Sequence, residues 1–130
     1  MEIKANNLRL LVMDNFKEFG QKVDTHLKLM RGVMNPNATF IVPTRLTRFA
    51  SGEGKGEILE SIRGKETYIL TDVMNHSCTY EMHGYLNHKS PDDHYQDLKR
   101  IISAMDGAED KLTVIMPYLY EGRQHKRKGR

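Results

Sequence analysis

The sequence predicts an α/β fold, with a mostly parallel sheet flanked by helices, and two observations support this prediction. Short apolar segments alternate with amphipathic helical segments, which is the order expected of parallel strands joined by covering helices. The chain has 130 residues, enough for a single domain with a sizeable core. We therefore expect one α/β domain over residues 1–130, with ligands bound beyond the carboxyl ends of its strands.

Four apolar segments are the expected strands. The first is Leu8–Asp14, and the third, Thr67–Val73, is rich in β-forming residues. The second and fourth are the short runs at 38–43 and 112–116. Each run is short and mostly apolar, which is typical of strands buried on both faces.

Two helices are expected between these strands. Asn15 can cap the first, which runs to about Arg31 with apolar residues at spacings of three and four, namely Phe16, Phe19, Val23, Leu27 and Met30. The second begins at Ser90, where an N-cap serine, Pro91 and two acidic residues together mark a helix start. Its apolar stripe precedes a stop near Gly107 and comprises Tyr95, Leu98, Ile101, Ile102 and Met105.

The segment from Thr47 to Gly64 is polar and contains three glycines at alternate positions, 52, 54 and 56. It lacks the spacing of a phosphate loop, and Gly56 falls one place too early for a dinucleotide fingerprint. We interpret about 47–58 as an extended arm or hairpin. Residues 74–90, which contain several turn-forming residues, are expected to form a loop.

Positive charge gathers at the end of the chain. The sequence has 20 Lys and Arg against 17 Asp and Glu, a formal charge of +3, yet five of the bases lie in the last eight residues. The remaining body is nearly neutral, which does not favour a nucleic-acid-binding domain, because such a domain spreads its bases over a face. The basic end is either a solvated tail or a phosphate-binding element.

Cysteine and histidine content bears on compartment and metal binding. Cys78 is the only cysteine, which excludes a disulfide framework and favours a reducing compartment, so we expect a cytoplasmic protein. No apolar run approaches the length of a membrane span.

Four histidines lie with Cys78 between residues 76 and 94, but they lack metal-binding spacings, so we expect no metal site here. Cys78 has no basic neighbour in sequence and is a poor candidate for a catalytic thiolate.

Five motifs follow one another in a recognisable order between residues 47 and 124. They are Arg48-Phe49-Ala50-Ser51-Gly52-Glu53, Glu60-Ser61-Ile62-Arg63-Gly64, Asp92-Asp93, Met105-Asp106, and Pro117-Tyr118 leading to Arg123-Gln124. In order and spacing they resemble the N-terminal half of ribose-phosphate pyrophosphokinase (PRPP synthetase). That family has an Arg/Lys-Phe-Ser-x-x-Glu arm, a Ser-Val/Ile-Arg-Gly turn, an Asn-Asp-opened helix ending near Asp-Ala, and a strand closing in Pro-Tyr-x-x-x-Arg-Gln.

The resemblance implies a phosphoribosyltransferase-like N-terminal domain on the ATP side of a longer, homo-oligomeric enzyme, a hexamer in the family. It implies transfer of diphosphate from ATP to ribose 5-phosphate with Mg²⁺, giving PRPP and AMP. The matching ATP-binding positions are Phe49, Ser51, Glu53, Arg123 and Gln124. Ser61 and Arg63 match positions that hold a regulatory phosphate or ADP between subunits. None of the family's catalytic or metal-binding positions falls in this segment, so we expect the chain alone to be inactive.

The residues themselves suit these roles. An exposed phenylalanine on a glycine-flanked arm offers a flat face to a purine, and an arginine can stack on a base or pair with phosphate. The pattern departs from the family in its longer segment at 74–90, and in His125, which stands where the family has Asp. The alternative is a non-catalytic nucleotide-binding or subunit-assembly module, and a basic-tailed RNA-binding domain comes third, since no aromatic-rich RNA motif is present.

Overall fold

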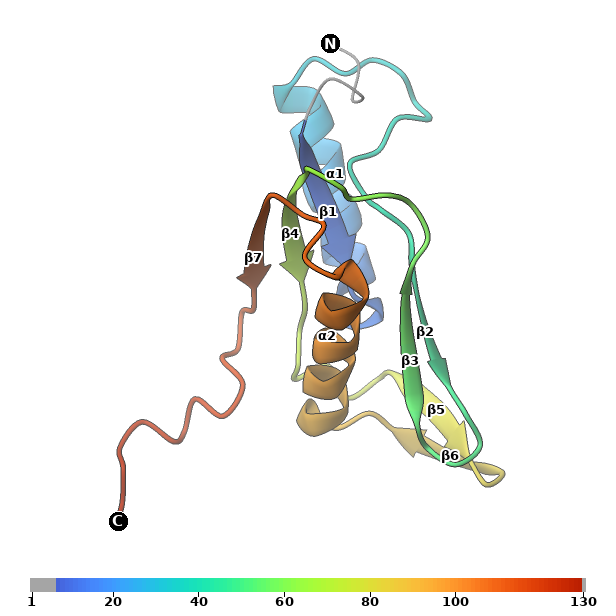
Figure 1. Cartoon of the computed structure of the whole chain (residues 1–130), viewed down its shortest axis with the longest axis vertical. Helices are drawn as coiled ribbons and strands as arrows, with labels where there is room; N and C mark the ends of the chain where they lie inside the picture. Colours follow the sequence, from blue (N-terminus) through green and yellow to red (C-terminus); the bar gives the residue numbers. More distant parts are fainter. Residues whose placement is uncertain (1–6, 130) are drawn as a thin grey trace.

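The computed structural model describes residues 7–129 and contains a parallel sheet, two long helices and two β-hairpins (Figure 1). In chain order the elements are β1 Leu8–Val12, the 3-10 helix η2 Asp14–Phe16, α1 Lys17–Met30, β2 Thr44–Arg48, β3 Gly54–Ile58, β4 Glu66–Leu70, β5 Thr79–Met82, β6 Tyr85–His88, α2 Pro91–Met105 and β7 Lys111–Ile115. Within this described part of the chain, neither long helix has the length and apolar character needed to cross a membrane.

The central sheet has the strand order β1-β4-β7, and both strand pairs are parallel. The register places Leu11 beside Ile69 and Ile69 beside Val114, so these three side chains lie on the same face. This topology confirms the predicted α/β class with a parallel sheet. All three carboxyl ends lie at one edge of the sheet, from which the segments after β1, β4 and β7 leave (Figure 1).

The predicted strand at 38–43 is wrong, because only Ile41 forms a bridge to β1. Pairing cannot extend beyond Val42, since Pro43 has no amide hydrogen to donate. On the other side, the Phe40 amide donates instead to the Asp24 carboxylate of α1, at 2.7 Å. The segment therefore runs along the edge of β1 without becoming a regular strand.

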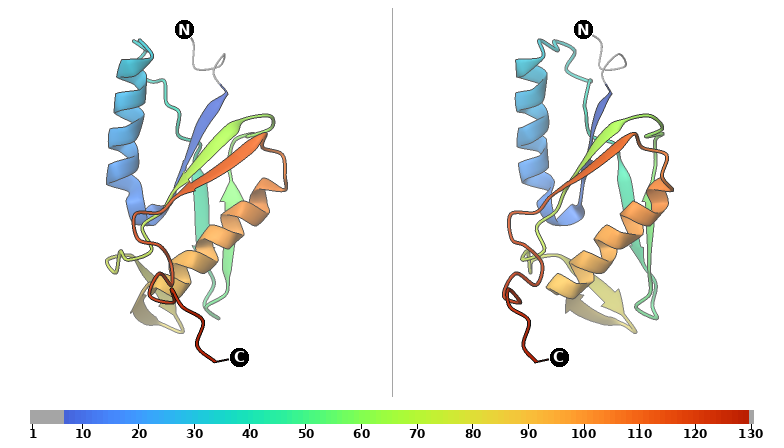
Figure 2. Two further views of the ribbon diagram at one scale, coloured as in Figure 1. Left: turned by 90° about the vertical axis from the view of Figure 1, so that its left-hand side faces the viewer. Right: turned by 60° about the vertical axis from the view of Figure 1, so that its left-hand side comes forward.

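Helix α1 covers one face of the sheet, and its contact line consists of small and polar residues (Figure 2). A Cβ built on Gly20 would lie only 2.3 Å from the Val12 side chain, and Asp24 is buried one turn further along. The predicted apolar face is therefore wrong in part, since Phe19 is 45% exposed and Met30 is 81% exposed. The close approach at Gly20 turns the large side chains away from the sheet.

Helix α2 covers the opposite face and begins as predicted (Figure 2). Ser90 Oγ accepts a bond from the Asp93 amide at 3.2 Å, and the Asp93 carboxylate accepts one from the Ser90 amide at 2.8 Å, which is a capping box. The predicted stripe is confirmed, because Tyr95 and Ile102 pack against a core formed between α2 and the sheet. That core comprises Leu11, Met13, Val42, Ile62, Ile69, Leu98, Ile101 and Met105.

Two antiparallel hairpins lie outside the central β1-β4-β7 sheet. β2 and β3 form the predicted arm, with Arg48 and Gly54 as the pair nearest its tip. β5 and β6 form a second hairpin within residues 74–90, where the sequence predicts a loop. Its two turn residues, His83 and Gly84, have φ angles of 50° and 80°, the positive values that a tight hairpin turn requires.

The alternating glycines of the arm allow β3 to lie directly against α2. A Cβ on Gly54 would lie 2.4 Å from the guanidinium carbon of Arg100, and one on Gly56 would lie 3.1 Å from the backbone of that residue. Gly52 has a φ of 94° and forms part of the turn at the tip. The hairpin interpretation of these glycines is confirmed, and packing against the helix explains the two that lie in the strand.

Candidate functional site

The segment after β7 is fastened to the first turn of α2 by one aromatic side chain. The Tyr120 ring stacks on Tyr95 with centroids 4.1 Å apart and planes 10° apart, and its hydroxyl donates to Asp92 at 2.5 Å. The hydrogen bond to this carboxylate, with a smaller contribution from burial, raises the pKa of Tyr120 to about 12. Tyr120 was not among the predicted site residues, although an aromatic residue between Pro117 and the basic run is a signal for such an anchor.

Beyond this anchor the chain makes a turn that presents the predicted phosphate-binding pair. The Gly122 amide donates to the Leu119 carbonyl at 3.0 Å, and the Gln124 amide donates to the Glu121 carbonyl at 2.9 Å. Arg123 and Gln124 are exposed at the end of this turn. Of the basic run, residues 126–128 are also exposed, and Arg130 lies outside the described residues.

The arm presents its three predicted residues at the hairpin tip. The Phe49 amide donates to the Glu53 carbonyl at 2.9 Å, and the Gly52 amide donates to the Phe49 carbonyl at 2.8 Å. Phe49 is 49% exposed, and Ser51 and Glu53 are exposed beside it. The tip thus offers one aromatic face together with a hydroxyl and a carboxylate, which suits a flat base with polar edges.

The predicted regulatory residues lie in the turn between β3 and β4. Ile62 is buried in the core, and Ser61 and Arg63 are exposed on either side of it. The Arg63 amide donates to Ser61 Oγ at 3.3 Å, so the turn is closed locally. A buried residue between two exposed polar ones holds both side chains at the surface.

These three groups of residues are not brought together within one chain. The arm tip and the segment after β7 lie on opposite sides of α2, and the turn at 60–65 lies at the amino ends of the strands, the far end of the sheet (Figure 1). A single copy therefore presents these residues as three separate groups.

A buried polar network lies at the carboxyl ends of β1 and β4, and sequence analysis missed it. The Asn15 amide group donates to Thr71 Oγ1 at 3.0 Å and to His94 Nδ1 at 3.1 Å, and its oxygen accepts from the Asp72 amide at 2.9 Å. His94 Nε2 lies 2.6 Å from the Asn75 carbonyl, which can only accept, so this nitrogen carries the proton. Asn15 is therefore not the predicted helix cap, because its side chain fixes the loop after β4.

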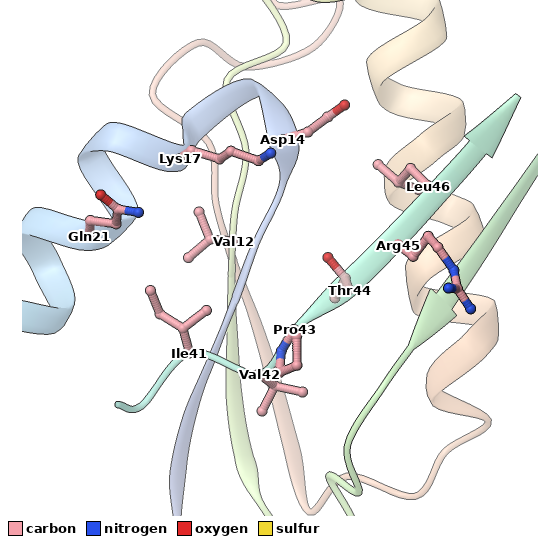
Figure 3. A pocket seen from close by; sticks show the side chains of 10 residues that line it. All are labelled: Val12, Asp14, Lys17, Gln21, Ile41, Val42, Pro43, Thr44, Arg45 and Leu46. Carbon is pink, nitrogen blue, oxygen red and sulfur yellow. The ribbon is translucent and has the colours of Figure 1, made fainter. Parts of the chain in front are cut away.

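A hollow with a volume of about 540 Å³ lies elsewhere at this edge of the sheet. Val12, Ile41 and Val42 gather along one side of it, and Asp14 and Lys17 lie above them (Figure 3). None of the predicted binding residues lines it. We assign no ligand to it, since the predicted chemistry lies on the arm and after β7.

The histidines and the cysteine do not assemble into a metal site among residues 7–129, where no group of three or more His, Cys, Asp or Glu could hold an ion. His94 is committed to the network described above, and His88 Nδ1 contacts the His76 carbonyl at 2.7 Å. Burial, together with the Asp14 carboxylate, raises the pKa of the Cys78 thiol. A raised pKa disfavours the thiolate form at neutral pH.

The parallel sheet with helices on both faces, the hairpin arm and the exposed Arg-Gln pair beyond the last strand together define a phosphoribosyltransferase-like α/β domain. A comparison with curated proteins gave no match to this chain. The sequence model of one family, described as the N-terminal domain of ribose phosphate pyrophosphokinase, matches residues 8–130. The chain belongs to this family, as its motifs predicted.

Proposed function

We propose that this chain is the ATP-side domain of a ribose-phosphate pyrophosphokinase, which transfers diphosphate from ATP to ribose 5-phosphate to give PRPP and AMP. One observation carries the proposal. In a member of this family, an exposed Phe49 stands on an ordered hairpin tip, and an exposed Arg123-Gln124 pair follows the carboxyl end of β7. These are the two chemical features that recognise a nucleoside triphosphate, a flat apolar face and a phosphate-pairing cation.

Each residue has a separate role in this proposal. Arg123 pairs with phosphate oxygens through its planar guanidinium group, and Gln124 adds a neutral hydrogen-bonding group. Phe49 stacks on the adenine, while Ser51 and Glu53 bond to its polar edge. Phosphoryl transfer depends mainly on positioning and on neutralising charge, and these residues contribute to both.

We further propose that the adenine site forms between two copies in a homo-oligomer, because the arm tip and the Arg123 loop lie apart within one chain. The exposed Ser61 and Arg63 would likewise hold a regulatory phosphate or ADP at a contact between copies. The single free Cys78 suits a cytoplasmic protein.

Mg²⁺ enters the proposal with the phosphates of ATP. No cluster of carboxylates or histidines in residues 7–129 fits a protein-held ion, so we derive no step from such a site. Mg²⁺ is commonly held by substrate phosphates with few protein ligands, and ATP can supply it in that form. Because the resemblance places none of the family's catalytic positions in this segment, we expect residues 1–130 alone to make no PRPP, and release of AMP from ATP and ribose 5-phosphate by the purified chain would contradict this.

The test of the proposed site is a titration of ATP against the wild type and Arg123→Ala, with Lys128→Ala as a control that removes a neighbouring charge. We expect Arg123→Ala to weaken ATP binding about tenfold at low salt, with a smaller effect at moderate salt, because phosphate pairing is screened. Lys128→Ala should bind nearly as well as the wild type. Equal ATP affinities in all three proteins at both salt concentrations would overturn the assignment of this loop.

A further inference from the structure

The tip of the arm is short, and its own hydrogen bonds are few. Between β2 and β3, the turn is closed by the backbone bonds from Phe49 to Glu53 and from Gly52 to Phe49, and by the Arg48 guanidinium, which donates to the Gly52 carbonyl at 3.1 Å. Ser51 Oγ adds only longer contacts of 3.4 Å to Glu53. A turn of this length at the end of a two-stranded ribbon needs further contacts to stay in one conformation.

The β5–β6 hairpin supplies those contacts at three points. The His83 amide donates to the Ala50 carbonyl at 3.0 Å. The Met82 sulfur lies 2.7 Å from where a Cβ on Gly52 would be, so the thioether packs directly on that glycine. The third contact is at the base of the tip, where the Arg48 guanidinium lies 4.1 Å above the centre of the Tyr80 ring.

Two of these contacts come from alternate residues of β5, Tyr80 and Met82, which therefore point to the same side of the strand. The hairpin turn then carries His83 over the end of the tip. One edge of the second hairpin thus lies along the tip of the arm, from Arg48 to Gly52, and β5 also contacts β2 (Figure 1).

The β5–β6 hairpin is itself firmly rooted in the body of the domain. Lys89, the residue after β6, donates through its amide to the Cys78 carbonyl at 2.8 Å. Its buried ammonium group lies between Asp14, at 3.0 Å, and Asp97 of α2, at 2.9 Å. Because the hairpin is fixed in this way to α2 and to the end of β1, it can hold the arm in one position.

We propose that the β5–β6 hairpin is a brace that holds the arm tip in its adenine-binding conformation, with Tyr80 and Met82 as positioning residues for adenine recognition. The inference rests on the proposed function of the arm. A braced tip needs no further ordering when it meets the base, and such pre-organisation increases affinity without adding a contact to the ligand. In this proposal the longer segment at 74–90, predicted from the sequence to be a loop, has the role of holding the arm tip.

The experiment compares Met82→Ala and Tyr80→Leu with Leu86→Ala, a control on the same hairpin whose side chain is 67% exposed. Two quantities are measured at one protein concentration, because the proposed adenine site is shared between copies. The first is amide hydrogen exchange at Phe49 and Gly52, which needs no ligand. The second is the affinity for ATP and for inorganic triphosphate, which lacks the base.

We expect exchange at both amides to rise about tenfold in Met82→Ala and Tyr80→Leu, and ATP affinity to fall several-fold, because local opening of the tip becomes easier. The affinity for triphosphate should stay at the wild-type value in both variants. The conservative variant Met82→Leu should keep both the exchange rates and the ATP affinity of the wild type. Leu86→Ala should change neither quantity.

Unchanged amide exchange at Phe49 and Gly52 in Met82→Ala and Tyr80→Leu would contradict the proposal that the β5–β6 hairpin holds the arm tip. Faster exchange with unchanged ATP affinity, or an equal loss of ATP and triphosphate affinity, would overturn the positioning role. Failure of the proposed arm function is recognised separately, because Phe49→Ala would then bind ATP as well as the wild type does. In that case the exchange data would still decide whether the hairpin braces the tip.

Discussion

Lys89 offers a sharp test of how the second hairpin is attached. Its ammonium group lies 3.0 Å from Asp14 and 2.9 Å from Asp97, and the residue is only 5% exposed. Lys89→Met keeps a side chain of similar length and removes the charge. The change leaves the Asp97 carboxylate, 4% exposed, without one of its two cationic partners, while Arg100 stays bonded to it at 2.6 Å.

The expected cost follows from these contacts. Removing one partner of a buried ion pair typically costs roughly 3–5 kcal/mol, because the remaining charge stays desolvated. Two features reduce the value here, since Arg100 still neutralises Asp97 and the Asp14 side chain is 33% exposed and can turn to water. We therefore expect Lys89→Met to lower the free energy of unfolding by about 2–4 kcal/mol at neutral pH.

The assay is urea unfolding of the wild type and the variant, followed by circular dichroism at one protein concentration. The matched control is Lys22→Met, which removes an ion pair with Glu18 whose side chains are 69% and 89% exposed. An exposed pair of this kind contributes at most about 0.5 kcal/mol. A Lys89→Met variant within the error of this control would refute the reasoning that the buried ammonium group stabilises the fold.

The pH dependence provides an independent check. Burial alone would lower the pKa of Lys89, but the Asp97 and Asp14 carboxylates outweigh it and raise the pKa above its ordinary value of 10.5. A group whose pKa is raised on folding stabilises the protein below its unfolded pKa and loses that contribution as the pH rises through the folded pKa. The difference in stability between wild type and Lys89→Met should therefore be constant up to about pH 10 and narrow above 10.5.

Three further predictions concern α2 and its neighbours. Ser90→Ala should lower the free energy of unfolding by about 1 kcal/mol, because it removes the acceptor of the Asp93 amide, and Ser103→Ala at the exposed end of the helix is its control. Gly56→Ala should cost about 1–3 kcal/mol in the same urea assay, since its Cβ would press on the α2 backbone; a stability equal to that of the exposed Lys55→Ala would contradict this. Asp92→Asn should return the pKa of Tyr120 from about 12 towards its ordinary value of 10.0 in an ultraviolet titration, and an unchanged titration curve would remove the Tyr120 anchor.

The sequence predicted those parts of the fold that depend on local chemistry. The start of α2 was predictable because the Ser-Pro-Asp-Asp motif caps a helix by bonds within four residues. The parallel sheet followed from the alternation of apolar runs with helices, which restricts the possible topologies. The arm followed from its glycines, which are unusual enough to mark a turn.

The features that were missed depend on contacts between distant segments. The buried line of α1 was mispredicted because periodicity counts large apolar residues, whereas Gly20 and Asp24 meet the sheet through close approach and hydrogen bonding. An asparagine side chain can cap a helix or hydrogen-bond to distant buried groups, and the sequence does not distinguish these two roles. The structure shows the second role, because the Asn15 amide group bonds to Thr71 and His94. The β5–β6 hairpin was missed because each of its strands has only 4 residues, so the alternation of polar and apolar residues in Thr79–Met82 is too short to mark a strand.

The first turn of α2 connects both segments to which we assign ATP binding. Asp92 accepts the hydroxyl of Tyr120, whose turn presents Arg123. Asp93 forms an ion pair with Arg48 at 3.0 Å, at the end of β2 directly before the tip that presents Phe49. The pKa of Asp93 is lowered although burial opposes this, because the Ser90 amide and Arg48 both stabilise its charged form. Two adjacent carboxylates thus hold the two proposed half-sites on opposite sides of one helix end, so a displacement of this turn would move both of them at once.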